Sequence, residues 1–276
     1  MEREIHRIHP APADPRPLAG TYLDAPLAPE DGDDRLFVYA NFVRSLDGRI
    51  SVRGADGRER VPADVANPRD WRLFQELAAR ADVLLSSGRY FRELAAGHAQ
   101  DVLPVDSGEA FADCRAWRRE HGLAPQPDVA VLSTSLDFTL PETLLEQGRR
   151  VMVLTTRDAD EMRASRLAAA GAEVIRLDSG PRVSGGRAMD ALAGRGYRRA
   201  YSVTGPWVLH ALVADDRLDA LFVTTVHRLI GGTDYAGILE GGRLEPAREW
   251  TLRWLYHDPH GPGPGGQQFA RYDRYD

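Results

Sequence analysis

The chain has 276 residues, of which 43% are hydrophobic and 28% are charged, a balance typical of a globular protein rather than a disordered or fibrous one. Its formal net charge of -6 excludes a global positive field that would hold nucleic acid or an anionic membrane surface. All 35 basic residues are arginine, which excludes enzyme classes that need a lysine, such as Schiff-base and P-loop enzymes.

The cysteine content and the hydropathy of the sequence indicate the cellular compartment in which the protein is expected. Cys114 is the only cysteine, so an intrachain disulfide, a Cys-based zinc site and an iron–sulfur cluster are excluded. The N-terminus lacks the apolar core of a signal peptide, and no stretch approaches the roughly 18 apolar residues of a membrane span. We therefore expect a cytoplasmic protein that does not bind membranes, with an inert thiol at Cys114.

Residues 1–35 are rich in proline and end in an acidic run. This composition predicts an N-terminal arm outside the core, which could wrap the domain, cross to a neighbour or be mobile. From Leu36 the sequence LFVYANFV predicts a buried strand, so we expect a single domain over 36–276. The prolines are Pro10, Pro12, Pro15, Pro17, Pro26 and Pro29, and the acidic residues are Glu30, Asp31, Asp33 and Asp34.

Short apolar runs then alternate with helical patterns. The spacing of Trp71, Phe74 and Leu77 predicts a helix after Asn67, and VLL at 83–85 predicts a short strand. Further strands are expected to begin at Val129, Val151, Glu173 and Arg199, with helices before and between them at 112–118, 158–171 and 188–196. This alternation predicts an α/β fold whose mainly parallel central sheet is flanked by helices.

The last part of the chain predicts a change of strand direction. A helix over Trp207–Ala214 and a strand over Ala220–Val226 come first. The runs TLRWLYHD and QQFARYDRY are then joined by the proline- and glycine-rich loop GPGPGG. We therefore expect a C-terminal antiparallel hairpin on the otherwise parallel sheet.

Polar residues follow the predicted strands at their carboxyl ends, where ligands collect in open α/β sheets. Hydroxyls, a glycine and a helix N-terminus could supply the donors that a pyrophosphate needs, although caps and turns would explain each residue alone. Arg157 could bind the 2′-phosphate of NADP, or it could be a surface arginine. The residues at these ends are Ser133, Thr155, Thr156, Arg157, Thr204, Gly205, Pro206 and Trp207.

Several other site classes lack their signatures. No G-x-G-x-x-G fingerprint joins a strand to a helix, and neither H-E-x-x-H nor G-x-S-x-G occurs. The close histidine pairs, His6 with His9 and His257 with His260, have no nearby carboxylate arrangement typical of a metal site. We therefore expect no metal.

The segment NFVRSLDGRIS, residues 41–51, is the most informative part of the sequence. Asp47 and Gly48 interrupt an apolar strand with a carboxylate, although a plain Asp-Gly turn would look the same. The segment resembles the S-L-D-G-[KR]-I signature of the bacterial riboflavin-pathway pyrimidine reductases, the RibD C-terminal family, whose fold is dihydrofolate reductase-like. The runs ELAARADVLLSSGRYF, LDALFVTTVHRLIGG and QQFARYDRY extend the similarity over most of 36–275.

The resemblance implies an NADPH-dependent oxidoreductase. In that family, hydride passes to C1′ of 5-amino-6-(5-phosphoribosylamino)uracil without metal or flavin. Asp47 is then the expected catalytic residue, also in contact with the substrate together with Asn41, Ser45 and Arg49. The cofactor is expected to contact the loop residues Ser87 and Gly88 and the polar residues at the carboxyl ends of the predicted strands. A small-molecule substrate and a homodimer are also expected.

The sequence departs from the family pattern in four ways. Thr204, Gly205 and Pro206 stand where Glu-Gly-Gly is usual, the cofactor loop reads SGRY at 87–90, and the common Asp-Asp-Pro run is absent, as is the deaminase zinc signature. Two alternatives therefore stay open: a same-fold NADPH reductase of another substrate, pterin-like or unassigned, and a non-catalytic nucleotide-binding protein. The arginine that would bind the substrate phosphate is open among Arg44, Arg49, Arg53, Arg58 and Arg60.

Overall fold

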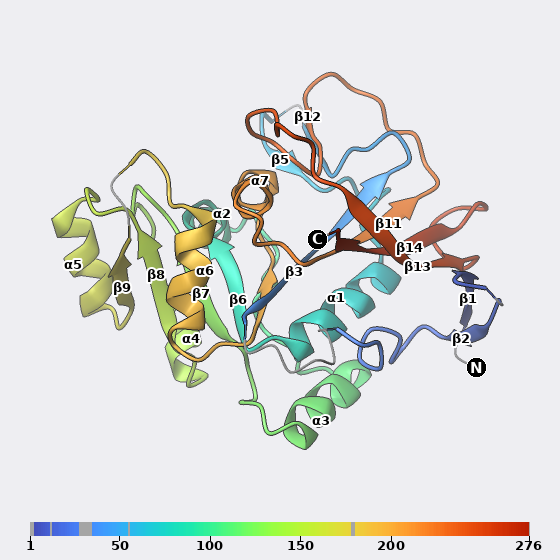
Figure 1. The fold of residues 1–276 in the computed structure, drawn as a ribbon, viewed down its shortest axis with the longest axis horizontal. Coiled ribbons are helices and arrows are strands. Elements are labelled where there is room, and N and C mark those ends of the chain that lie inside the picture. Colours follow the sequence, from blue (N-terminus) through green and yellow to red (C-terminus); the bar gives the residue numbers. More distant parts are fainter. Residues whose placement is uncertain (1–2, 12, 28–34, 55, 178–179, 276) are drawn as a thin grey trace.

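The computed structural model describes residues 3–11, 13–27, 35–54, 56–177 and 180–275. Within these residues an 11-stranded sheet forms the centre of the protein (Figure 1). In sheet order the strands are β2 (Pro15–Pro17), β1 (Glu4–His9), β13 (Trp250–Asp258), β14 (Gln267–Arg274), β11 (Ala220–Val226), β3 (Phe37–Ser45), β10 (Arg199–Ser202), β6 (Val83–Ser87), β7 (Asp128–Leu132), β8 (Val151–Thr155) and β9 (Glu173–Arg176).

Strand direction divides the sheet into two parts. The strands from β11 to β9 all run parallel, whereas β14, β13, β1 and β2 pair with their neighbours in antiparallel fashion. The expected α/β fold, with a mainly parallel sheet and a C-terminal antiparallel hairpin, is therefore confirmed. Strand β10 lies between β3 and β6. The order of the strands along the sheet therefore changes direction there, which makes this position a topological switch point.

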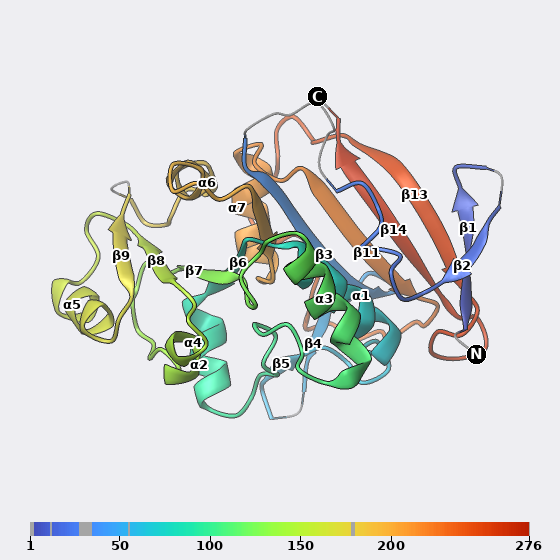
Figure 2. The ribbon, with the colours of Figure 1, turned by 90° about the horizontal axis from the view of Figure 1, so that it is seen from below.

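Helices cover both faces of the parallel part (Figure 2). The first face packs on α1 (Pro68–Arg80), α2 (Gly88–Ala95), α3 (Ala112–Glu120), α4 (Glu142–Glu146) and α5 (Glu161–Ala169). The second face packs on α6 (Gly185–Ala193) and α7 (Pro206–Ala214). A short 3-10 turn at Glu109–Phe111 precedes α3, and a separate small sheet joins β12 (Tyr235–Ala236), β4 (Ser51–Arg53) and β5 (Glu59–Arg60). Cys114 on α3 is buried, and burial raises the pKa of its thiol to about 12.

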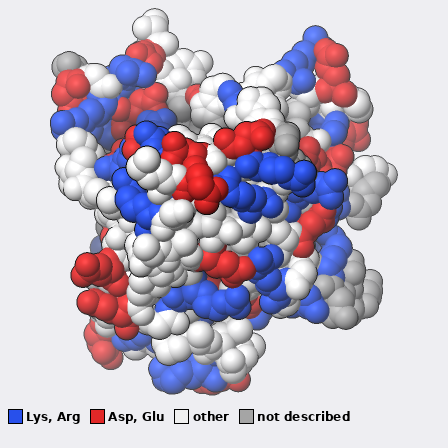
Figure 3. Space-filling view, turned by 90° about the vertical axis from the view of Figure 1, so that its left-hand side faces the viewer, with Lys and Arg blue, Asp and Glu red and all other residues white. Residues whose placement is uncertain are grey.

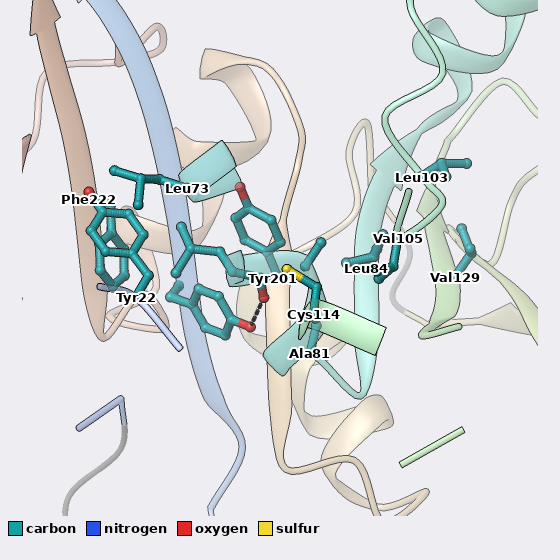
Figure 4. Packing of buried hydrophobic residues seen from close by; sticks show 14 of the residues in the cluster. Tyr22, Leu73, Ala81, Leu84, Leu103, Val105, Cys114, Val129, Tyr201 and Phe222 are labelled. Carbon is teal, nitrogen blue, oxygen red and sulfur yellow. Dashed lines mark hydrogen bonds between the residues drawn. The ribbon is translucent and has the colours of Figure 1, made fainter. Parts of the chain in front are cut away.

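The N-terminal segment is part of the core over its described residues, which corrects the expectation of an arm outside it. Strands β1 and β2 extend the sheet beyond β13. Tyr22 is 2% exposed and lies beside Phe222, with the two ring centroids 5.1 Å apart (Figure 4). Its ring centroid is also 5.2 Å from that of Trp254. The buried carboxylate of Glu76 on α1 accepts hydrogen bonds from the backbone N–H groups of Gly20 and Tyr22, both at 2.7 Å.

The reason for this correction lies in how the apolar residues are spaced. Leu18, Leu23 and Leu27 are buried with Tyr22, and they stand between prolines that dominate the average composition. Two prolines occupy β2, the edge strand, where a missing N–H removes no ladder hydrogen bond. Pro12, Pro29 and the acidic run of Glu30, Asp31, Asp33 and Asp34 lie outside the described residues, and a domain boundary at residue 36 stays a prediction.

Candidate functional site

The carboxyl ends of the parallel strands bring the predicted site residues to one edge of the sheet. Ser45 ends β3, Ser87 ends β6 and Thr155 ends β8, while Ser133 and Thr204 follow β7 and β10. Three strand spacings separate β10 from β8, which amounts to about 15 Å. The edge therefore suits an extended ligand that crosses several strands.

Ser87 and Gly88 form the start of α2, and the expected cofactor loop at 87–90 is instead the first turn of this helix. The Ser87 hydroxyl accepts a hydrogen bond from the N–H of Tyr90 at 3.3 Å, which caps the helix and explains why it begins here. A Cβ at Gly88 would lie 2.7 Å from Oγ of Ser133 and 3.0 Å from the ring of Phe138. Only glycine lets the start of α2 approach the segment that follows β7 this closely.

At the end of β8, a hydroxyl and a guanidinium group lack side-chain partners among the described residues. Thr155 and Thr156 are buried, and Oγ1 of Thr155 has no hydrogen-bond partner among the described residues. Arg157 is exposed, and no described carboxylate forms an ion pair with its guanidinium. A buried hydroxyl beside an exposed, unpaired arginine fits an anionic group such as a phosphate.

The turn from β10 into α7 exposes the helix N-terminus. Hydroxyl oxygens of Ser202 and Thr204 lie 2.7 Å apart, and Gly205 at the N-cap position gives α7 no side-chain cap. A Cβ at Gly205 would meet nothing within 4 Å, so the backbone there is open to a ligand. Pro206 is the first helical residue, and Trp207 is 50% exposed with the guanidinium carbon of Arg182 4.8 Å from its ring centroid.

Asp47 lies in the turn after β3 and accepts several hydrogen bonds. Its carboxylate accepts from the Ser45 hydroxyl, from the N–H of Gly231 at 2.8 Å and from the N–H of Ile230 at 3.2 Å. Arg49 forms an ion pair with it at 2.8 Å. The Ser45 hydroxyl, followed by the Gly231 amide, lowers the pKa of Asp47 to about 2. The carboxylate is therefore ionised near neutral pH and holds the turn at 230–232 instead of donating a proton.

Arg49 fixes the same turn from a second side. It donates to the carbonyl oxygen of Gly232 at 3.0 Å, and its guanidinium carbon lies 4.3 Å from the ring centroid of Tyr235. Asn41 lies four residues before Ser45 on β3, about 13 Å away along the strand, where its Oδ1 accepts a hydrogen bond from the Tyr201 hydroxyl. The structure thus joins Ser45, Asp47 and Arg49 in one cluster and places Asn41 in a different one.

An arginine-lined cavity of about 370 Å³ lies between the β4–β5 hairpin and α2. Three of the five arginines left open for a substrate phosphate line it, whereas Arg44 donates to Thr225 and Arg49 belongs to the Asp47 cluster. Glu59 on β5 holds two of the cavity's guanidinium groups, that of Arg53 at 3.3 Å and that of Arg89 at 2.9 Å. The lining residues are Arg53, Gly57, Arg58, Glu59, Arg60, Arg89, Glu93 and His98.

Two residues near this edge were missed in the sequence. Arg89 lines the cavity from α2, and Asp70 on α1 is 8% exposed with its Oδ1 lacking a hydrogen-bond partner in the described part of the chain. The sequence does contain a pattern that points to Asp70. This residue stands four residues before Phe74, on the apolar stripe that predicts the helix. A carboxylate on a buried stripe is unusual unless it is paired or functional.

In the described residues, no group of three or more His, Cys, Asp or Glu side chains is arranged to hold a metal ion. None of the described helices combines the length and the apolar character of a membrane span. His6 and His257 face each other across β1 and β13, and the His257 ring lies 6.1 Å from that of His227. Figure 3 shows arginine and acidic side chains interspersed over the face that it presents.

Comparisons with known proteins give the family. The model of the RibD C-terminal domain matches residues 36–260. A pyrimidine reductase-like protein from Corynebacterium diphtheriae is similar in structure, with a TM-score of 0.67, 19% identity, and coverage of 90% of this chain and 96% of that one. The riboflavin biosynthesis reductase of Saccharomyces cerevisiae has a TM-score of 0.56 at 14% identity, with 90% and 93% covered.

RibD of Acinetobacter baumannii is also similar, with a TM-score of 0.59 and 14% identity. The similarity covers 88% of this chain but only 59% of that longer protein. Among curated protein sequences no match was found. At these low sequence identities, the structural similarity establishes a shared fold. The family model, in contrast, matches most of the sequence. The chain therefore belongs to the RibD C-terminal domain family.

Proposed function

We propose that this protein is an NADPH-dependent reductase of 5-amino-6-(5-phosphoribosylamino)uracil or a related ribosylamino pyrimidine, acting by hydride transfer to C1′. The observation that carries the proposal is the alignment of hydroxyl groups, glycines and a helix N-terminus at the carboxyl ends of β6, β7, β8 and β10, beside the Asp47 turn. Membership of the RibD C-terminal domain family and the structural similarity to reductases support an oxidoreductase.

The residues present fit a phosphate-bearing dinucleotide. Among the described residues, Thr155 offers a buried hydroxyl without a partner and Arg157 offers a guanidinium without an ion-pair partner for a 2′-phosphate. Gly205 offers open backbone at the N-terminus of α7. Ser87, Gly88, Ser133, Thr156, Thr204, Pro206 and Trp207 complete the proposed cofactor set. When bound, NADPH supplies the hydride, and the chain's own residues orient the reactants and exclude water.

The substrate is proposed to lie beside β3. Asp47 and Arg49 hold the turn at 230–232, so we assign Asp47 to positioning that turn against the substrate, with Ser45 supporting its carboxylate. The arginine cavity next to α2 would take the substrate phosphate, because guanidinium groups bind phosphate through paired hydrogen bonds. A bound phosphate would compete with Glu59 for Arg53 and Arg89.

The residue Pro206 favours the alternatives to this reaction, a reductase of another substrate or a nucleotide-binding protein without catalysis. Pro206 lacks the N–H that another residue would offer at the first position of α7, so this helix has one donor fewer for a phosphate. A reductase of the same fold with a different substrate, pterin-like or unassigned, and a nucleotide-binding protein without catalysis both remain possible outcomes of the test. A homodimer and a cytoplasmic location remain predictions.

The first experiment is calorimetric titration of the purified protein with NADPH and, separately, with NADH. Preferential binding of NADPH supports the assignment, and the aminouracil substrate is then added while NADPH oxidation is followed by absorbance. Oxidation that depends on this substrate supports the proposed reaction. Binding of NADPH without oxidation of any tested substrate favours the non-catalytic alternative, and failure to bind either cofactor contradicts the proposal.

A further inference from the structure

Glu59 carries a carboxylate that bridges two arginines of the arginine-lined cavity. Its Oε1 accepts a hydrogen bond from Nη2 of Arg53 at 3.3 Å, and its Oε2 accepts one from Nη2 of Arg89 at 2.9 Å. Arg53 belongs to β4, Glu59 to β5 and Arg89 to α2. The hairpin and the helix are therefore joined by a single carboxyl group.

Each of the two guanidinium groups is also held by a second carboxylate, through a different nitrogen. Nε of Arg53 lies 2.7 Å from Oδ2 of Asp234, the residue before β12. Nε of Arg89 donates to Oε1 of Glu93 at 2.7 Å, one turn further along α2. Both guanidinium groups would therefore keep their orientation if Glu59 moved away, with Nη2 of each still directed at the position of its carboxylate.

The bridge has the geometry that a bound phosphate would have. A phosphate group accepts paired hydrogen bonds from guanidinium groups, as a carboxylate does, but it offers a third terminal oxygen and carries up to one more negative charge. The Glu59 side chain is 26% exposed, so its carboxylate can turn into water when another anion takes its place. Exposed ion pairs contribute little free energy each, and a doubly charged group can displace them.

The two remaining arginines of the cavity are held within the hairpin. Arg60 pairs with Asp56 at 2.6 Å, and Arg58 lies 4.0 Å from the same carboxylate. They add positive charge to the cavity, but their common partner does not connect them to α2. Of the cavity's four arginines, Arg53 and Arg89 are thus the two that converge on one point from the hairpin and from the helix.

We propose that Glu59 is the specificity-determining residue for the substrate phosphate: its carboxylate takes the place of the phosphate between Arg53 and Arg89 and is displaced when a phosphate monoester binds. A neutral ribosyl compound brings no charge that could replace the two ion pairs, so the cavity selects phosphorylated substrates. This inference rests on the proposed function, because it concerns the phosphate of that reaction's substrate. Arg89 follows Gly88 directly, so the phosphate and the proposed cofactor would meet at the first turn of α2.

The test is calorimetric titration with ribose 5-phosphate and with D-ribose, without NADPH and at constant ionic strength. At about pH 8 the phosphate monoester is doubly charged, since its second pKa is about 6. Glu59→Gln keeps the size of the side chain and removes its charge. We expect this variant to bind ribose 5-phosphate about three- to tenfold more tightly, because two exposed ion pairs no longer have to be broken. Its binding of D-ribose should not become tighter.

Two control variants separate displacement from a general loss of negative charge. Glu93→Gln removes the same charge from the same cavity, but Glu93 lies at Nε of Arg89, outside the bridge. The gain in ribose 5-phosphate affinity should therefore be smaller than in Glu59→Gln. Glu173→Gln on β9 removes a carboxylate that also pairs with two arginines, in another part of the sheet, and should leave binding unchanged.

The possible results differ in what they contradict. Unchanged or weaker binding of ribose 5-phosphate by Glu59→Gln overturns the inference, and so does an equal gain in Glu93→Gln, which would reflect net charge alone. Absence of binding by both the unaltered protein and Glu59→Gln also overturns it. Tighter binding by Glu59→Gln in a protein that binds no NADPH would contradict the proposed function and leave the phosphate position at Glu59 standing.

Steady-state kinetics give a second readout that a purely structural role would not produce. With the aminouracil substrate, Glu59→Gln should raise kcat/KM about three- to tenfold through a lower KM, since the displacement belongs to substrate binding and not to hydride transfer. A structural defect in the hairpin would instead raise KM or lower kcat. An unchanged KM contradicts the assigned role of Glu59.

Discussion

Asp47 and Asp70 illustrate how differently two aspartates of one protein behave. Hydrogen bonds from Ser45 and Gly231 lower the pKa of Asp47 to about 2, whereas burial raises the pKa of Asp70 to about 6. Asp47 is therefore a permanent charge at neutral pH, and Asp70 changes its protonation state near pH 6. The sequence signature at 45–49 leads to the first of these groups, and only burial identifies the second.

Asp47→Asn should lower turnover by about 10- to 100-fold while the fold stays intact, because the turn at 230–232 is held by hydrogen bonds to a charged carboxylate. The new amide would place N–H against the N–H groups of Ile230 and Gly231, or would keep only one acceptor for them. The turn at 230–232 would then lose its anchor. The measurement is kcat for the aminouracil substrate together with the circular dichroism spectrum, and unchanged kcat would show that Asp47 has no role in the reaction.

Asp70→Asn should stabilise the protein at pH 7 by up to about 3 kcal/mol and have little effect at pH 4. Burial raises the pKa of Asp70 in the folded state, so between about pH 4 and about pH 6 the folded protein binds more protons than the unfolded chain does. Protonation of Asp70 therefore stabilises the fold fully below about pH 4, and this contribution is lost as the pH rises to about 6. Urea unfolding at both pH values measures this, and a loss of stability at both would indicate a structural role.

Arg157→Ala should reduce the preference for NADPH over NADH about tenfold or more, because a guanidinium–phosphate pair is among the stronger hydrogen-bonded contacts. The side chain is exposed and forms no ion pair with a described carboxylate, so its removal should not change the fold. The ratio of the two dissociation constants, measured by calorimetry, is the readout. Arg119→Ala on α3, also exposed, is the control for loss of a positive charge. An unaltered ratio in Arg157→Ala means that the 2′-phosphate lies elsewhere.

At the scale of elements, the site depends on where the helices begin. Helix α2 begins at Gly88, where close contact with Ser133 leaves no room for a side chain, whereas Gly205, the N-cap residue of α7, lies in open space. The same residue type therefore has two different roles. One glycine allows two elements to pack, and the other leaves the backbone free to approach a ligand.

Gly205→Ala should leave the melting temperature nearly unchanged and weaken NADPH binding by about tenfold, the loss expected when one charge-assisted hydrogen bond is disrupted. A Cβ at Gly205 meets nothing within 4 Å and the backbone φ is -78°, so the protein itself tolerates the methyl group. A phosphate seated on the first turn of α7 would meet it. Gly237→Ala, which also has open space around its Cβ, is the control. Unchanged NADPH affinity in Gly205→Ala would place the phosphates away from α7.

At the scale of the whole molecule, the N-terminal segment closes one face of the antiparallel part of the sheet. Arg80 on α1 donates to the carbonyl oxygen of Tyr22 at 2.6 Å, and Arg271 on β14 donates to that of Leu27 at 3.0 Å. Together with Glu76, these side chains satisfy backbone groups that burial would otherwise leave without partners. The described residues before the matched family domain therefore pack on the same hydrophobic core as that domain.

Tyr22→Ala should lower the free energy of unfolding by about 3–5 kcal/mol, as for other large-to-small aromatic substitutions in a core. The ring packs against Phe222 and Trp254, and its loss would leave a cavity between the segment and the sheet. Chemical denaturation gives the free energy. Tyr275→Ala, with 67% of the residue exposed, should change it by no more than about 0.5 kcal/mol. Similar values for the two variants would mean that the N-terminal segment contributes little to stability.

The sequence by itself determined the α/β fold, most strands and helices, the family, and the polar residues that end β7, β8 and β10. Apolar periodicity, caps and turn residues are local signals, so neighbouring residues suffice to read them. The tertiary structure decided which distant groups meet: Asp70 with Thr224, Asp47 with the amides of Ile230 and Gly231, and Tyr22 with Phe222. Burial and backbone hydrogen bonds from remote segments depend on the packing of the complete chain, and for that reason no local pattern could supply them.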